Sequence, residues 1–533
     1  MSADVCAVEV AVSLTSLRRL DWRFVLPIPP NGYRRAVLVG GADDVVDAAR
    51  RMPLACEVLT SLEELAPGDR ADLVAVLAPC RPSMDRVLDC LEPGAVLYHE
   101  FTRWTGSPIA RRRRELERAL RRARIPQRVV YAVRPQHERS EAMLPTEPAD
   151  AARWFFSDVY VSERPSQRLL RAATLALLAG RVPLDLLAPD VAIVAGGSEP
   201  PLTRAPALLT HGGSRSVLAC FPPGGTRPHA MVKLPKLAMF ESRTNAEQQV
   251  LGDVRETVSP AVAEAVPTPL GVERAGTVFA ARETCLPGQT ISRRMFAGCN
   301  VRSPSARSIE DLGAAASWLG ALHRDVRFDA RTWDDAAMEA YVTGPIAAYV
   351  QLFGDDVAER RLFDHARRSA SVLHGVSFPT VWQHRDFTTN NIVRDRTGHL
   401  GVIDWEGARR GPPVVDLLHL LTMWHLRLAG SSTARQARSL AAVHDMLTTG
   451  EASDRAAVGS AAARSRYFER TGLTPRLAAA LHLPMMVELA CRRHDELEAA
   501  ADERAAPGDL RGRIVEAQLV HSLAVAIQRR GAT

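Results

Sequence analysis

The feature that most constrains the fold is a short segment with two carboxylates and one amide around residue 390. Asp386 is followed five positions later by Asn391, and Asp404 lies eighteen positions after Asp386. Asp404 ends the apolar run Leu400 to Ile403, a pattern typical of a buried strand. A loop from Asp386 to Asn391 and a rigid strand before Asp404 can bring all three side chains into one cleft.

These three side chains suit phosphoryl transfer. The transition state of that reaction needs charge neutralisation and alignment more than covalent chemistry. A carboxylate such as Asp386 can orient an acceptor hydroxyl and take its proton. Mg²⁺ prefers hard oxygen ligands, and Asn391 and Asp404 offer a carbonyl oxygen and a carboxylate. The sequence therefore predicts a magnesium-dependent phosphotransfer site.

The segment resembles the catalytic loop of the protein-kinase-like superfamily, HxDxxxxN followed by an Asp after a strand. It is most similar to the aminoglycoside phosphotransferase and choline kinase branch. Ile403-Asp404-Trp405-Glu406 and the downstream run Gly411 to Leu417 carry this similarity. The resemblance implies that Asp386 is the catalytic base and that Asn391 and Asp404 hold Mg²⁺. It predicts a small-molecule kinase that uses Mg-ATP and a hydroxyl acceptor.

Two positions depart from the family pattern. Arg385 stands where this branch usually has Gly, and Thr388 stands where Ser/Thr protein kinases keep a Lys. The second departure favours a small-molecule acceptor over a protein. The resemblance also implies that His384 orients the loop without moving a proton. Asp416 is expected to bond to the loop backbone.

The nucleotide side of the site is expected upstream, around a lysine. Of 67 Lys plus Arg residues, the lysines are Lys233 and Lys236 alone. His229 to Lys233 reads as a strand that ends in a lysine. By resemblance, Lys233 reaches the phosphates of ATP and pairs with Glu247 on the following helix, although Glu241 is a competing partner. Strand alternation points the two lysines to opposite faces, which predicts a strong effect on ATP use for Lys233→Ala and a mild one for Lys236→Ala.

Residues 205–533 are predicted to form a two-lobed, α+β, protein-kinase-like domain, with strands first and helices after residue 308. The segment Gly212 to Ser216 is a candidate cover for the phosphates. Glu283 to Cys285 is a candidate link between the lobes, where the backbone would meet adenine. The acceptor pocket is expected in the helical part.

Residues 1–198 alternate between strand and helix candidates, which predicts an α/β domain with a parallel sheet. Val37 to Gly41, Asp72 to Leu77 and Leu91 to Tyr98 resemble pieces of a class I methyltransferase-like Rossmann domain. The loop after the first strand has Gly40-Gly41 but no GxGxG, and the second strand lacks a terminal acid for ribose hydroxyls. The domain is therefore predicted to be degenerate and not to bind S-adenosylmethionine.

Bulk properties narrow the remaining choices. A net charge of +6 over 533 residues does not indicate a nucleic-acid partner. The eight cysteines form no CxxC pair and there is no run of 18 apolar residues, so a cytoplasmic protein without a membrane span is expected. Two alternatives stay open: a bifunctional methyltransferase–kinase, and a pseudokinase scaffold that binds nucleotide without turnover. The acceptor and the oligomeric state are not determined by the sequence.

Overall fold

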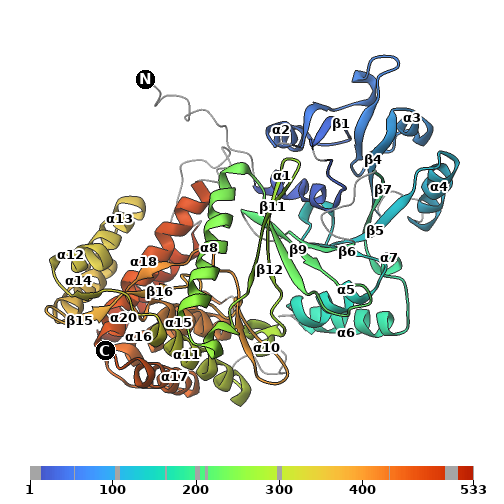
Figure 1. The fold of residues 1–533 in the computed structure, drawn as a ribbon. Coiled ribbons are helices and arrows are strands. Elements are labelled where there is room, and N and C mark those ends of the chain that lie inside the picture. Colours follow the sequence, from blue (N-terminus) through green and yellow to red (C-terminus); the bar gives the residue numbers. More distant parts are fainter. Residues whose placement is uncertain are drawn as a thin grey trace, which may run out of the picture.

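The computed structural model describes residues 14–29, 31–52, 54–102, 109–161, 165–197, 205–210, 214–296, 303–430, 432–498 and 514–531. Its main feature is one mixed sheet of twelve described strands, which runs through both halves of the chain (Figure 1). Most helices of the C-terminal half gather beside one end of this sheet (Figure 1).

The N-terminal end of the sheet is parallel. Its elements are β1 (Tyr33–Val39), α2 (Asp43–Arg51), β2 (Ala55–Leu59), β3 (Ala71–Val76), α3 (Met84–Asp89) and β4 (Leu91–Thr102). Strand β1 lies between β2 and β3, and β3 pairs with β4, all in parallel. Val37 and Leu38 point to opposite faces and both are fully buried, as expected for a parallel strand covered on both sides. This end confirms the parallel sheet that the alternating pattern predicted.

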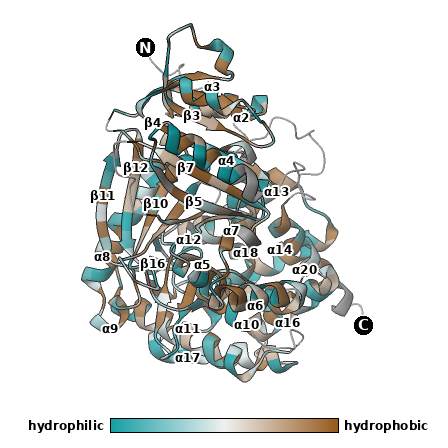
Figure 2. Ribbon diagram, turned by 90° about the vertical axis from the view of Figure 1, so that its right-hand side faces the viewer, coloured by the Kyte–Doolittle hydropathy of each residue, from teal (hydrophilic) through white to brown (hydrophobic). Residues whose placement is uncertain are grey.

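The sheet then changes direction. The next elements are α4 (Ile109–Arg122), β5 (Gln127–Arg134), β6 (Ala142–Pro145), α5 (Asp150–Trp154), α6 (Pro165–Ala179), α7 (Leu184–Leu187) and β7 (Asp190–Gly196). Strand β7 lies antiparallel between β4 and β5, and its residues are buried throughout. Figure 2 shows hydrophobic residues along β5 and β7. The methyltransferase-like character of residues 1–198 stays a prediction.

The second half of the chain extends the same sheet. It adds β8 (Ala207–Leu209), β9 (Arg215–Cys220), β10 (Ala230–Pro235), α8 (Glu241–Thr257), β11 (Pro269–Ala275) and β12 (Val278–Thr284). These strands are antiparallel, and β8 joins the halves because it pairs with β6 on one side and β9 on the other. The strand order is β11-β12-β10-β9-β8-β6-β5-β7-β4-β3-β1-β2. Residues 198–204, which include the boundary between the two predicted domains, lie outside the described residues.

The rest of the chain is mainly helical, as predicted. The helices are α9 (Pro260–Ala263), α10 (Ile291–Phe296), α11 (Ala306–Asp325), α12 (Asp335–Met338), α13 (Gly344–Phe353), α14 (Val357–Ser371), α15 (Val415–Ala429), α16 (Thr433–Thr448), α17 (Arg455–Thr471), α18 (Arg476–Glu498) and α20 (Val515–Gly531). One apolar core, with Trp333, Trp405 and Trp424 at its largest buried positions, joins them. Strands β14 (Ala330–Thr332) and β15 (Ser377–Pro379) pair beside it. Within the described residues, no helix has the length and apolar character needed to cross a membrane.

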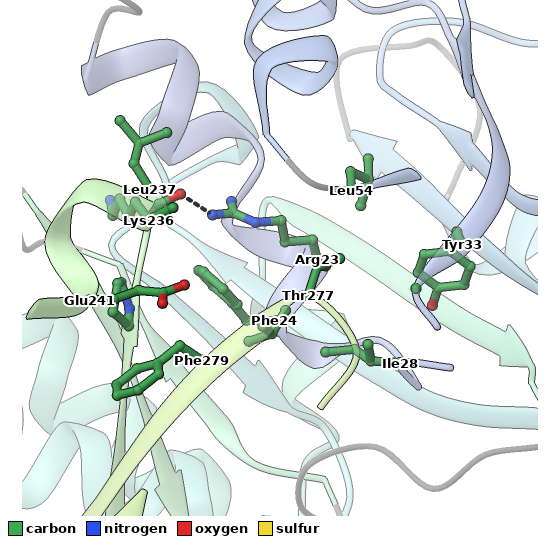
Figure 3. Close-up of a pocket in the computed structure, with 14 residues that line it drawn as sticks. Arg23, Phe24, Ile28, Tyr33, Leu54, Lys236, Leu237, Glu241, Thr277 and Phe279 are labelled. Carbon is green, nitrogen blue, oxygen red and sulfur yellow. Dashed lines mark hydrogen bonds between the residues drawn. The ribbon is translucent and has the colours of Figure 1, made fainter. Parts of the chain in front are cut away.

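The N-terminal segment packs against the strands of the second half. After α1 (Leu14–Arg19), a 3-10 turn (Asp21–Val25) lies beside the end of β10. Lys236 Nζ lies 2.8 Å from the Asp21 carboxylate, and Ser216 on β9 donates to the same carboxylate at 2.8 Å. Arg23 donates to the carbonyl oxygen of Lys236 at 2.8 Å, in a small pocket between the two parts (Figure 3). These contacts tie the first residues of the chain to β9 and β10.

Candidate active site

A pair of short strands positions the acid and the amide of the predicted site. The strands around it are β13 (Gln289–Thr290), β16 (Val381–Gln383), β17 (Ile392–Arg394), β18 (Leu400–Val402) and β19 (Arg409–Gly411). Strands β17 and β18 are antiparallel, with Ile392 opposite Val402. Ile403 N donates to the carbonyl oxygen of Asn391 at 2.9 Å. This backbone hydrogen bond places Ile403 opposite Asn391, and Asp404 is the next residue in the chain.

Asn391 also contacts Asp386 directly. Its Nδ2 atom donates to the Asp386 carboxylate at 2.7 Å and to the Asp386 carbonyl oxygen at 3.0 Å. These bonds use the amide nitrogen and leave the amide oxygen as the atom that can meet a cation. The two side chains are therefore oriented by each other, as a carboxylate that accepts and an amide that donates.

The loop before Asp386 is held by a fully buried histidine and a fully buried aspartate. His384 has one ring nitrogen 3.0 Å from the carbonyl oxygen of Ile403, and its other ring nitrogen accepts from Asp386 N at 3.3 Å. Burial lowers the pKa of His384. Asp416 accepts from the backbone N–H groups of His384 and Arg385 at 2.7 and 2.8 Å. Both residues thus bond to the loop as predicted.

Arg385 shows why glycine is usual at its position. Its φ angle is +69°, in the left-handed region that costs energy for a side chain with a Cβ. The guanidinium extends to Glu488 on α18, with contacts of 2.7 and 2.8 Å to the two carboxylate oxygens. The bidentate pair and the Asp416 bonds hold this conformation in place.

Lys233 lies in a buried ion-pair cluster on β10. Its Nζ atom is 2.6 Å from Glu247 on α8 and 2.7 Å from Glu283 on β12. Glu241 instead pairs with Arg274, so the geometry favours Glu247 over the competing partner. Glu247 also accepts from Trp405 N at 2.8 Å. One carboxylate thus connects the lysine to the residue that follows Asp404.

The carboxylates of this cluster differ in charge state. Burial opposes ionisation of Glu247, but Lys233 and Arg215 outweigh it and lower its pKa to about 2. Burial, and to a smaller extent the repulsion from Glu247, raise the pKa of Glu283 to about 6 although Lys233 opposes the rise. Burial and the neighbouring Asp404 raise the pKa of Glu406. The cluster therefore holds more negative charge than its own cations balance.

The sequence placed Arg215, the first residue of β9, in the candidate phosphate cover of residues 212–216, but it assigned this side chain no partner. One guanidinium nitrogen lies 2.5 Å from Glu247 and 3.1 Å from Glu406, and the other contacts Asp404. Burial lowers the pKa of this arginine, but the three carboxylates, Asp404 foremost, raise it above its usual range. The available signal was its place next to the glycine pair of residues 212–213, which lie outside the described residues. Its pairing register could not be read from the sequence.

The structure thus brings the predicted residues into one region, because contacts connect them in a continuous chain. Lys233 pairs with Glu247, Arg215 bridges Glu247 and Asp404, and the β17–β18 pairing places Asp404 beside Asn391. The oxygen atoms of Asp386, Asn391 and Asp404 are the hard donors that Mg²⁺ accepts. The excess of carboxylates also suits a divalent cation. The roles of the individual residues stay predictions.

The sequence comparison identifies the C-terminal part. Residues 224–448 match the model of the phosphotransferase enzyme family. The predicted resemblance to aminoglycoside phosphotransferases is confirmed for this part of the chain, which contains β10, α8 and both segments of the catalytic loop. No curated protein matches the chain.

Several solved phosphotransferases are similar to the chain in structure. The ADP-bound aminoglycoside phosphotransferase APH(2'')-Ib is 14% identical, with a TM-score of 0.36, and the match covers 60% of this chain and 93% of that one. The macrolide 2'-phosphotransferase MphH from Brachybacterium faecium is 15% identical, with a TM-score of 0.37 and coverages of 56% and 93%. A thermostable APH(4)-Ia mutant in complex with ADP and hygromycin B is 14% identical, with a TM-score of 0.35 and coverages of 60% and 92%.

Proposed function

We propose that residues 205–533 transfer the γ-phosphoryl group of ATP to a hydroxyl group of a small molecule or sugar. One observation carries this proposal: ion pairs through Arg215 connect Lys233 and Glu247 to Asp404, and backbone pairing connects Asp404 to the loop in which Asn391 contacts Asp386. The family match over residues 224–448 supports the same reaction class. The need for ATP is the reason to expect the reaction in the cytoplasm.

In the proposed reaction, Asp386 binds the acceptor hydroxyl and takes its proton as the oxygen attacks the γ-phosphorus. The bond to the bridging oxygen of the β-phosphate breaks, and ADP leaves with that electron pair. Asn391 keeps the Asp386 carboxylate in place through its amide nitrogen. Lys233, oriented by Glu247 and Glu283, binds the phosphates. Asn391 and Asp404 would hold Mg²⁺, which supplies charge neutralisation for the phosphates.

Residues 1–198 are proposed to support this site and not to carry out a second reaction. The bonds from Asp21 to Lys236 and Ser216 support this role, because they attach the N-terminal segment to β9 and to the end of β10. Strand β8 adds a covalent and a hydrogen-bonded connection between the two parts of the sheet.

The test is a screen for ADP release with purified protein, Mg²⁺ and a panel of hydroxyl-bearing small molecules, including aminoglycosides, macrolides, sugars and nucleosides. We expect at least one acceptor to stimulate ADP release, and we expect Asp404→Asn to abolish the magnesium-dependent rate. Nucleotide binding without turnover on any acceptor would instead favour the pseudokinase scaffold. Wild-type turnover in Asp404→Asn would contradict the proposed site.

A further inference from the structure

The side chain of Arg215 lies on the same face of the sheet as Lys233. In the β9–β10 pair, Val217 is opposite Lys233 and Arg215 is opposite Pro235. Because side chains alternate along a strand, Arg215 and Val217 share a face, and directly paired residues share it too. Arg215 and Lys233 thus approach Glu247 from neighbouring strands, each on a different carboxylate oxygen.

The carboxylates in the ion-pair cluster around Arg215 outnumber the cations. The described cluster contains two cations, Arg215 and Lys233, and four carboxylates: Glu247, Glu283, Asp404 and Glu406. With all groups ionised, the cluster carries two more negative than positive charges. The Arg215 side chain is only 9% exposed, whereas that of Asp404 is 39% exposed. A ligand can therefore reach Asp404 from solvent while Arg215 contacts it from the protein side.

A divalent cation on Asp404 would change the balance for Arg215. The cation and the guanidinium would compete for the same carboxylate charge and repel each other. A guanidinium is well suited to a polyphosphate, because its planar fork matches two oxygens at once. In the proposed reaction the phosphates lie between Lys233 and Asp404, which is also where Arg215 reaches.

We propose that Arg215 is a nucleotide-binding residue that changes partners. Without ligand it neutralises Asp404 and Glu406, and when the metal–nucleotide complex binds it turns to the polyphosphate. Lys233 and Arg215 then both bind the polyphosphate, and Glu247, which pairs with both side chains, positions them. This inference rests on the proposed phosphotransferase function and adds a residue and a binding order to it: the metal alone is disfavoured by Arg215, and the metal with nucleotide is favoured by it.

Two binding measurements on Arg215→Gln test the partner change. Mn²⁺ without nucleotide, followed by electron paramagnetic resonance, should bind about tenfold more tightly than to the wild type, because the competing charge is gone. Mg-ADP, followed by calorimetry, should bind about tenfold more weakly, because a charged hydrogen bond to phosphate is lost. A merely structural role would weaken both. Opposite shifts in one variant are therefore diagnostic.

Arg282→Gln is the matched control. Arg282 lies on β12 opposite Val232, on the other face of the same sheet, and it pairs with Glu273. Both affinities should stay at the wild-type level there. If Arg215→Gln does not fold, Arg215→Lys serves in its place, because it keeps the charge and loses the fork. It should bind Mn²⁺ like the wild type and Mg-ADP several-fold more weakly.

Unchanged Mg-ADP affinity, or weakened Mn²⁺ binding, in Arg215→Gln would overturn the inference. For Arg215→Lys, Mg-ADP affinity equal to that of the wild type would do the same. The proposed function fails in a different way, because the wild-type protein would then bind no Mg-ADP or would release no ADP with any acceptor. If the wild type binds Mg-ADP and Arg215→Gln binds it equally well, the proposed function is unaffected and only the role of Arg215 is ruled out.

Discussion

Glu100 at the parallel end of the sheet and Glu247 at the antiparallel end are both buried carboxylates, but their surroundings differ. Glu100 pairs with Arg19 at 2.6 Å, accepts from Tyr98 at 3.0 Å and from Ala78 N at 2.9 Å, and lies 3.3 Å from His137. Its neighbours balance its charge. Glu247 shares its two cations with three other carboxylates, so its cluster keeps an excess of negative charge.

The parallel end of the sheet also leaves little space around Gly40, at the end of its first strand. In open parallel sheets, ligands bind beyond the carboxyl ends of the strands where the order reverses, which here is between β1 and β3. A Cβ added to Gly40 there would overlap with Cys80 and lie 2.9 Å from the Leu77 carbonyl oxygen. The loop that follows β3 therefore lies tightly against Gly40, and Glu100, which binds the loop through Ala78 N, lines a cavity of about 200 Å³ together with it.

The difference between the two carboxylates indicates which end of the sheet is expected to bind a ligand. A carboxylate network whose charge is balanced by its own neighbours stabilises the fold. An unbalanced cluster beside a partly exposed aspartate costs stability, and a metal–nucleotide complex can compensate it. Four predictions test this contrast.

Asp386→Ala should have the largest effect. Removing a general base lowers turnover by about 10²- to 10⁴-fold, and the loss should fall on kcat because the acceptor proton moves only in the transition state. Steady-state kinetics with the best acceptor, together with calorimetry of Mg-ADP, separates the two effects. A weakened Mg-ADP affinity with unchanged kcat would mean that Asp386 serves the nucleotide and not the acceptor.

Variants of the two lysines test whether the two faces of β10 have different roles. Lys233→Ala should lower kcat/KM for ATP by about 10- to 100-fold, because a charged contact to phosphate is lost. Lys236→Ala should leave ATP use nearly unchanged but destabilise the protein by about 3–5 kcal/mol, because Asp21 then stays buried without its lysine. The mild effect on ATP use stays a prediction, and the structure adds to it an expected loss of stability.

Kinetics and urea unfolding of both lysine variants provide the check. The faces would be wrongly assigned if Lys236→Ala proved stable and impaired with ATP. They would also be wrong if Lys233→Ala lost stability alone.

The two buried glutamates should respond to pH in opposite directions. The Arg19 pair outweighs burial and lowers the pKa of Glu100 to about 2, so its stabilisation is present above pH 4.5 and is lost as the pH falls toward 2. At pH 7 it amounts to about 3 kcal/mol, which Glu100→Gln should remove. Burial raises the pKa of Glu283 to about 6, so its ionised form costs stability above pH 6. Glu283→Gln should therefore stabilise the protein at pH 8 and have little effect at pH 4.5.

Urea unfolding of both glutamine variants between pH 4.5 and pH 8 measures these differences. A destabilising Glu283→Gln at pH 8 would show that its charge is needed to balance Lys233. The contrast between the two ends of the sheet would then be lost.

The smallest expected signal is that of S-adenosylmethionine. We expect no saturable micromolar binding to the full-length protein, because the Leu77–Cys80 loop lies tightly against Gly40 and Asp43 and Asp44 begin the next helix. Calorimetric titration is the direct measurement, with Mg-ADP as the positive control on the same sample. Saturable binding with methyl transfer to any acceptor would support the bifunctional alternative.

The sequence by itself determined the local parts of the site. Asp386, Asn391 and Asp404 lie within one short loop and hairpin, so their spacing already restricts their geometry. The scarcity of lysine pointed to Lys233 and Lys236, between which the family resemblance chose Lys233, and the alternating pattern of the first half predicted the parallel strands β1 to β4. Each of these inferences depends on residues that are close in the chain or on a period of two or 3.6 residues.

Only the tertiary structure decided the pairings between distant segments. It chose Glu247 over Glu241, placed Arg215 against Asp404, and joined both halves into one sheet through β8. It also placed the loop after β3 tightly against Gly40. The physical reason is that a shift of one residue in strand register turns every side chain to the other face. The register of β9 against β10 is set by packing across the whole sheet, and no local pattern specifies it.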